Sequence, residues 1–246
     1  MRSRFVGELT PADVMTLVNV VIGFLAVAVA PTDPELAARL VLLAAVADGI
    51  DGVLARAFGG SAMGPYLDSL ADVPSFAIAP AIIVYGASQE AAFGWHDGLE
   101  AMLVVAVPAL FVALAVLRLG AYSAYDTAAS RTVGAPTTLA ATIVAVSLLT
   151  VHWTPELLLG GMAILAGAMV SPVIYPDLLA RDAMIMGVIH VLAVAMPMAY
   201  GRVFPYALLT LAIAYLLLGP RFYWGETERR LRAPPKGKRS KGDPEE

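Results

Sequence analysis

The chain has 246 residues, of which 59% are hydrophobic and 15% are charged, and its mean hydropathy is +0.75. A soluble domain carries roughly 25% charged residues, so this composition predicts an integral membrane protein. The absence of cysteine excludes disulfides and thiolate metal ligands. The net charge of −4 says little by itself, and we expect no nucleic-acid partner.

Apolar runs long enough for a membrane helix, about 20 residues, recur along the whole chain. Eight are expected, at residues 12–30, 35–57, 64–87, 101–123, 136–152, 155–173, 184–200 and 203–219. Pro197 is expected to kink the seventh helix. The predicted fold class is therefore all-α, a polytopic transmembrane helical bundle at residues 1–220. The basic, proline-containing tail at 221–246 is expected to be disordered.

The basic residues are distributed unevenly between the connecting segments. With the N-terminus inside, fourteen of the 16 Lys and Arg residues fall on the cytoplasmic side, and only Arg39 and Arg202 fall on the other. This positive-inside pattern predicts a multi-pass protein of the cell membrane with both termini in the cytoplasm. It also places the connection between the second and third helices on the side where nucleotides are available.

Four aspartates flank that connection, where a membrane protein tolerates charge poorly. One unpaired carboxylate in the middle of a membrane helix costs roughly 2.5–3.5 kcal/mol. Asp48 and Asp51 are three residues apart on one predicted helix, and Asp68 and Asp72 are four apart on the next, so each pair shares a helix face. Because the linker at 58–63 is short, the two pairs should converge. Sites rich in carboxylate oxygen suit Mg²⁺ or Mn²⁺.

Two other interpretations of the aspartates remain open. A structural ion-pair network is disfavoured because four acids face one nearby base, Arg56. A cation transporter or proton relay would distribute its carboxylates through the depth of the bilayer, whereas these four lie together at one end of their helices.

The segment from Asp48 to Asp72 resembles the signature of the CDP-alcohol phosphotransferases, integral membrane enzymes that displace CMP from a CDP-linked lipid. The pattern Asp-x-x-Asp-Gly-x-x-Ala-Arg…Gly-x-x-x-Asp-x-x-x-Asp is matched at every position. One departure is the spacing between Arg56 and Gly64, which is seven residues where the family usually has eight.

The resemblance implies a six-helix catalytic core followed by two further spans, and a homodimer. It implies that Asp48, Asp51, Asp68 and Asp72 hold two divalent cations, Mg²⁺ or Mn²⁺, bridged by the diphosphate, with Asp72 also the general base for the acceptor hydroxyl. The expected contacts to the CDP-lipid are Gly52, Ala55, Arg56, Gly64, Thr16 and Asn19. For Thr16 and Asn19, hydrogen bonding between helices is an equally good interpretation.

The residues after the signature indicate which alcohol accepts the lipid phosphate. Val73 stands where enzymes with phosphorylated acceptors are expected to have Lys, and the stretch from Ser75 to Pro80 resembles the serine-transferring branch. Arg118 and Arg131 are candidates for binding the serine carboxylate, although membrane topology alone also explains both.

We therefore expect the protein to synthesise a phospholipid from a CDP-linked lipid and L-serine, and to contact the lipids of the membrane. CDP-archaeol is favoured over CDP-diacylglycerol as the donor, because the loop length and the Ala-rich composition look more like archaeal members. The alternative within the same chemistry is a phosphorylated polyol acceptor, glycerol phosphate or inositol phosphate.

Overall fold

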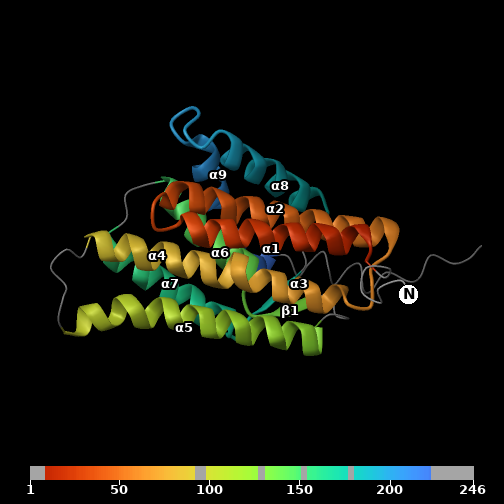
Figure 1. Ribbon diagram of the computed structural model, residues 1–246, viewed down its shortest axis with the longest axis horizontal. Helices are drawn as coiled ribbons and strands as arrows, with labels where there is room; N and C mark the ends of the chain where they lie inside the picture. The colour runs from red at the N-terminus through yellow and green to blue at the C-terminus, as the bar shows by residue number, and fades with distance from the viewer. Residues whose placement is uncertain (1–8, 92–97, 127–130, 151–153, 177–179, 223–246) are drawn as a thin grey trace, which may run out of the picture.

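The computed structural model describes residues 9–91, 98–126, 131–150, 154–176 and 180–222. These residues form a bundle of long helices that run roughly along one common direction (Figure 1). The predicted basic tail lies almost entirely outside the described residues.

The helices are α1 (Pro11–Val29), α2 (Pro34–Phe58), α3 (Gly64–Asp72), α4 (Ala79–Ala91), α5 (Leu99–Ala121), α6 (Thr137–Thr150), α7 (Pro155–Met169), α8 (Ala180–Ala195) and α9 (Val203–Phe222). A π-helical segment, η1 (Val73–Ile78), joins α3 to α4 without a break, and a second, η2 (Tyr122–Asp126), continues α5. Each predicted run therefore corresponds to one helical rod, and the all-α fold class is confirmed.

Four of the described rods are long and apolar enough to cross a membrane: 11–29, 64–89, 99–124 and 203–222. α6 and α7, and α8 from Asp182 onward, are apolar but shorter. α2 has 25 residues, and its apolar sequence is interrupted by the charged residues Arg39, Asp48, Asp51 and Arg56. The lengths and apolar compositions of these helices are typical of a membrane protein. α2, which carries Asp48 and Asp51, has more charged residues than the four membrane-length rods.

Two features differ from the sequence-based expectation. The span expected at 184–200 begins earlier, and α8 ends at Ala195, so Pro197 follows the helix instead of kinking it. Two three-residue strands, β1 (Arg131–Val133) and β2 (Ile174–Pro176), pair antiparallel with Thr132 opposite Tyr175. Gly134 ends β1 with φ +80°, and its N–H donates to the Val173 carbonyl at 2.7 Å.

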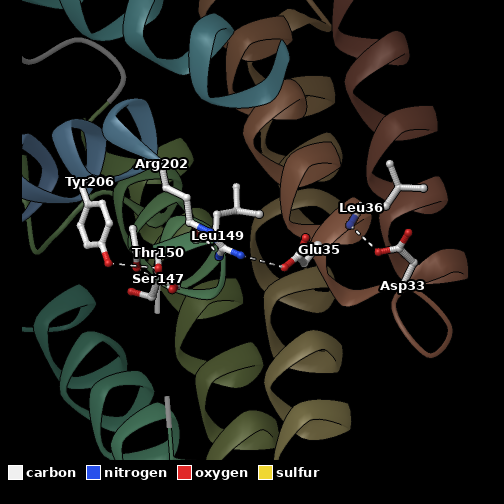
Figure 2. A network of polar contacts seen from close by, with 8 residues as sticks. All are labelled: Asp33, Glu35, Leu36, Ser147, Leu149, Thr150, Arg202 and Tyr206. Atoms are coloured by element: carbon white, nitrogen blue, oxygen red, sulfur yellow. Dashed lines mark hydrogen bonds and ion pairs between the residues drawn. The ribbon is translucent and has the colours of Figure 1, made fainter. Parts of the chain in front are cut away.

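The two arginines expected on the non-cytoplasmic side both bind the carboxyl ends of helices. Arg39 Nε donates to the Val194 carbonyl near the end of α8 at 2.9 Å. Arg202 Nη1 donates to the Leu149 carbonyl near the end of α6 at 2.9 Å, and its Nη2 lies 3.7 Å from Glu35 Oε1 (Figure 2). Because helix carboxyl ends carry partial negative charge, these contacts stabilise both arginines away from the basic side.

α1 lies against η1 at Gly23, and this contact positions the segment that follows Asp72. Ser75 Oγ donates to the Asn19 carbonyl at 3.1 Å, and a Cβ at Gly23 would lie 2.9 Å from both the N and Cα of Ser75. We expect Gly23→Ala to lower the free energy of unfolding by about 1–3 kcal/mol through overpacking, measured as thermal unfolding in detergent. Gly86→Ala is the control, because its added Cβ would meet nothing within 4 Å. Equal melting temperatures for the two variants would contradict this close packing.

Candidate active site

Three of the four signature aspartates meet at one end of the bundle. Asp48 comes from α2, and Asp68 and Asp72 come from α3; α1 packs against both helices and lies between them in Figure 1. One carboxylate oxygen from each lies within 4.8 Å of the other two. The short connection between α2 and α3 thus brings Asp48 to Asp68 and Asp72, and the three carboxylates are close enough to share a metal ion.

Asp51 is not part of this group of three and is bound instead by a residue of α1. It is buried, and its Oδ2 accepts a hydrogen bond from Thr16 Oγ1 of α1 at 2.8 Å. The other α1 candidate, Asn19, donates from Nδ2 to Asp72 Oδ1 at 3.4 Å. Thr16 and Asn19 therefore do form hydrogen bonds between helices, and in both cases the partner is a signature aspartate.

A cavity of about 360 Å³ opens between α1, α2 and α3 on one side of the aspartates. Its lining includes six of the predicted residues: Thr16, Asp51, Gly52, Ala55, Gly64 and Asp68. Glycine at positions 52 and 64 leaves backbone exposed to this space. Asp68 and Tyr122 complete the wall nearest to the other aspartates.

Arg56, which is expected to contact the CDP-lipid, does not line the larger cavity. Its guanidinium folds back over Gly52, with Nη1 3.5 Å from the position of a Cβ there. Arg56 is therefore placed at the edge of the predicted nucleotide site.

A second, smaller cavity of about 200 Å³ lies on the other side of Asp68 and Tyr122. It contains Asp48, Asp68 and Asp72 together with Arg118 of α5. The Arg118 guanidinium stacks over the Tyr122 ring at 5.1 Å, a cation–π arrangement that fixes its position. Arg131 begins β1 opposite Pro176, and its side chain lies outside the described part of the chain.

Residues 9–174 match the family model of the CDP-alcohol phosphatidyltransferases. The chain belongs to this family. Similar proteins include the CDP-diacylglycerol–serine O-phosphatidyltransferase of Mycobacterium leprae, 40% identical over 73 residues, which are 29% of this chain and 24% of that protein. The archaetidylserine synthase of Methanothermobacter thermautotrophicus is 28% identical over 169 residues, covering 67% of this chain and 68% of that protein.

The serine O-phosphatidyltransferase of Helicobacter pylori is 33% identical over 152 residues, covering 58% of this chain and 61% of that protein. The chain matches 36% of the length of the Mycobacterium bovis enzyme of the same name. The predicted family is thus confirmed, and the named relatives are serine O-phosphatidyltransferases and an archaetidylserine synthase.

The donor atoms of this phosphatidyltransferase site fit a hard divalent cation. Carboxylate oxygens are the ligands that Mg²⁺ and Mn²⁺ prefer, and like charges this close repel unless a cation lies between them. Asn19 Oδ1 adds a buried acceptor that has no hydrogen-bond partner among the described residues. The four aspartates, with Asn19 beside Asp72, could hold the ions that the family resemblance implies.

Several residues of the site were missed by the sequence analysis. Asp13, whose pairing with Thr10 marks a helix start, also accepts from Ser61 Oγ at 2.9 Å in the larger cavity. Thr132 and Thr138 line the smaller cavity. The capping pattern could have located Asp13, but nothing in the local sequence indicates that the two threonines lie near the aspartates.

The hydrogen bond from Thr16 to Asp51 yields a prediction about the metal site. Thr16→Val keeps the shape of the side chain and removes the donor, so Asp51 loses its fixed orientation. We expect the affinity for Mn²⁺ to fall about 10–100-fold, as for other residues that orient metal ligands, measured by titration of purified protein. Thr16→Ser keeps the hydroxyl and should bind Mn²⁺ as the wild type does. Equal Mn²⁺ affinities for the valine and serine variants would show that the hydroxyl has no positioning role.

Proposed function

We propose that the chain transfers the phosphatidyl or archaetidyl group of a CDP-linked lipid to the hydroxyl of L-serine and releases CMP. One observation carries this proposal: the aspartate cluster lines the smaller cavity, which meets the larger one at Asp68 and Tyr122. The larger cavity would take the cytidine diphosphate part of the donor, and the smaller one the acceptor.

Asp72 is the residue best placed to receive the proton of the acceptor. Asn19 occupies Oδ1 of its carboxylate, which leaves Oδ2 to accept a proton from the serine hydroxyl. The serine oxygen then bonds to the phosphorus that carries the lipid alcohol. The bond from that phosphorus to the CMP oxygen breaks, and CMP leaves with the bonding electrons.

Divalent cations bound by the aspartates would supply charge stabilisation at the attacked phosphorus and on the departing CMP. The protein side chains provide the geometry. Thr16 orients Asp51, Asn19 orients Asp72, and the antiparallel turn holds Asp48 against Asp68.

Serine fits the smaller cavity better than a phosphorylated polyol does. Arg118 could bind the serine carboxylate, and Thr132 and Thr138 offer hydroxyls to the amine. A phosphorylated acceptor needs a more cationic pocket, and Arg118 is the one cation among the described residues that line this cavity. The alternative of a cation transporter is disfavoured by family membership and by the grouping of the aspartates at one end.

The orientation and the donor complete the proposal. The positive-inside pattern supports an orientation in which the aspartate end of the bundle faces the cytoplasm, with both termini on that side. The donor would be CDP-archaeol or CDP-diacylglycerol, since relatives of both names match the chain. A homodimer is proposed from the family resemblance.

The test is CMP release from purified protein with Mg²⁺ or Mn²⁺ and either CDP-archaeol or CDP-diacylglycerol. Serine, glycerol phosphate and inositol phosphate are supplied in turn. The proposal expects CMP release that depends on serine and on the metal. Release with a phosphorylated acceptor alone would reject serine, and no release under any condition would reopen the transport interpretation.

A further inference from the structure

Two further cavities extend from the smaller active-site cavity toward the last two helices. A cavity of about 320 Å³ shares Thr132, Pro136 and Thr138 with the aspartate cavity and reaches His190 on α8. The next cavity, of about 400 Å³, lies between α8 and α9. It shares Met186 and Tyr215 with the 320 Å³ cavity, so the three spaces follow one another from the aspartates to the α8–α9 surface.

The middle cavity lies deeper in the bundle than the aspartates do. Ala45 lines it three residues before Asp48 on α2, about 4.5 Å farther from the aspartate end of that helix. Thr142 lines it one helical turn beyond Thr138 of α6. A molecule with its phosphate at the aspartates would thus extend into the apolar depth of the membrane through this space.

Thr132 and Thr138 stand where the middle cavity joins the aspartate cavity, and the polar groups farther inside have partners within the protein. His190 Nδ1 donates to the Met186 carbonyl at 2.9 Å, and its Nε2 lies 3.4 Å from Thr142 Oγ1. The Tyr175 hydroxyl donates to the Leu216 carbonyl at 3.1 Å, which directs it away from a ligand. What the cavity offers to an occupant is therefore mainly hydrocarbon, contributed by residues such as Leu139 and Met186.

The outer cavity is mainly apolar, with Asp182 in its lining, and is built by helices outside the family match. The match ends at residue 174, whereas α8 and α9 begin at Ala180 and Val203. Its wall includes Ile185, Leu211, Leu218 and Phe222. Figure 1 shows α8 lying along α2 at the outside of the bundle, where lipid would reach it.

We propose that α8 and α9 form a groove that receives a hydrocarbon chain of the CDP-linked lipid. The hydrocarbon chain would run from this groove between Met186 and Tyr215 toward the aspartates. This inference rests on the proposed function for the identity of the lipid. The continuity of the cavities with the aspartate cluster favours the donor lipid over a lipid of the surrounding bilayer. The last two helices thus have a substrate-binding role.

The direct test uses CDP-diacylglycerol with a photoreactive diazirine in one acyl chain. The wild-type protein in phosphatidylcholine nanodiscs is irradiated, and the labelled peptides are mapped by mass spectrometry. We expect adducts on α8 and α9 that decrease about tenfold or more with excess unlabelled CDP-dioleoylglycerol, but not with added phosphatidylcholine. Adducts elsewhere, or adducts that phosphatidylcholine removes equally well, would overturn the proposal.

A matched pair of glycine variants gives a second, kinetic test. Gly187 lines the middle cavity, and a Cβ there meets nothing within 4 Å, so Gly187→Phe fills the space without displacing backbone. We expect its KM for CDP-dioleoylglycerol to rise about tenfold or more, with CMP binding unchanged. Gly160→Phe on the exposed face of α7, where a Cβ also meets nothing within 4 Å, should behave as wild type.

The outcomes separate the groove from the reaction. If the wild type releases CMP with serine while Gly187→Phe matches it and α8 and α9 stay unlabelled, the groove is rejected and the function stands. If labelling of α8 and α9 is competed by CDP-dioleoylglycerol but serine yields no CMP, the acceptor assignment fails and the groove stands.

Discussion

Asp72→Asn is expected to reduce kcat by about 10²–10⁴-fold while the protein still binds CDP-lipid. The amide keeps the size of the side chain and can still meet Asn19, but it cannot take the proton of the acceptor hydroxyl. Asp72 is buried and lines the same cavity as Asp48 and Asp68. Among these three carboxylates, Asp72 is the one for which a hydrogen bond from Asn19 is seen. CMP release and binding of radiolabelled CDP-lipid measure the two effects separately.

The matched control for this variant is Asp33→Asn. Asp33 caps the N-terminus of α2 by accepting from the Leu36 N–H at 2.9 Å (Figure 2), about four helical turns before Asp48. Because asparagine caps helices as well as aspartate does, stability should be retained and turnover should equal that of the wild type. Near-normal turnover of Asp72→Asn would show that Asp72 is not the general base.

Removal of divalent cations is expected to abolish CMP release, and Mg²⁺ or Mn²⁺ should restore it. Asp48→Asn should raise the dissociation constant for Mn²⁺ about tenfold or more, because one of three converging carboxylates is lost from the group within 4.8 Å. Titration of the metal-free protein with Mn²⁺, followed by electron paramagnetic resonance, measures binding without reference to activity.

Glu156→Gln provides the comparison for the metal titration. Glu156 is an exposed acid in the first turn of α7, and its neutralisation changes the net charge by the same amount as Asp48→Asn. Its Mn²⁺ affinity should equal that of the wild type. Equal affinities for Asp48→Asn and Glu156→Gln would mean that the aspartates do not form the metal site.

The rods and the aspartate cluster could be predicted because both depend on patterns that are local in the sequence. Apolar runs of membrane length mark each helix, and spacings of three and four residues place Asp48 with Asp51, and Asp68 with Asp72, on shared faces. The short connection keeps α3 close enough to α2 for Asp48 and Asp68 to meet, although α1 packs against both helices. Family membership followed from the same 25 residues.

The second cavity could not be predicted in this way. Thr132 and Thr138 come from β1 and α6, more than 50 residues after the signature, and only the pairing of β1 with β2 and the packing of α6 bring them to Asp72.

By itself, the sequence determined that this protein is a helical, membrane-type member of the CDP-alcohol phosphatidyltransferase family and that aspartates from two helices converge, because hydrophobicity and helical periodicity act over a few turns. Only the tertiary structure decided how Thr16 and Asn19 hold Asp51 and Asp72, and how α8 and α9 connect to the site through a row of cavities. Those features arise where side chains from distant segments pack together, and the space that remains between them is set by their combined shapes.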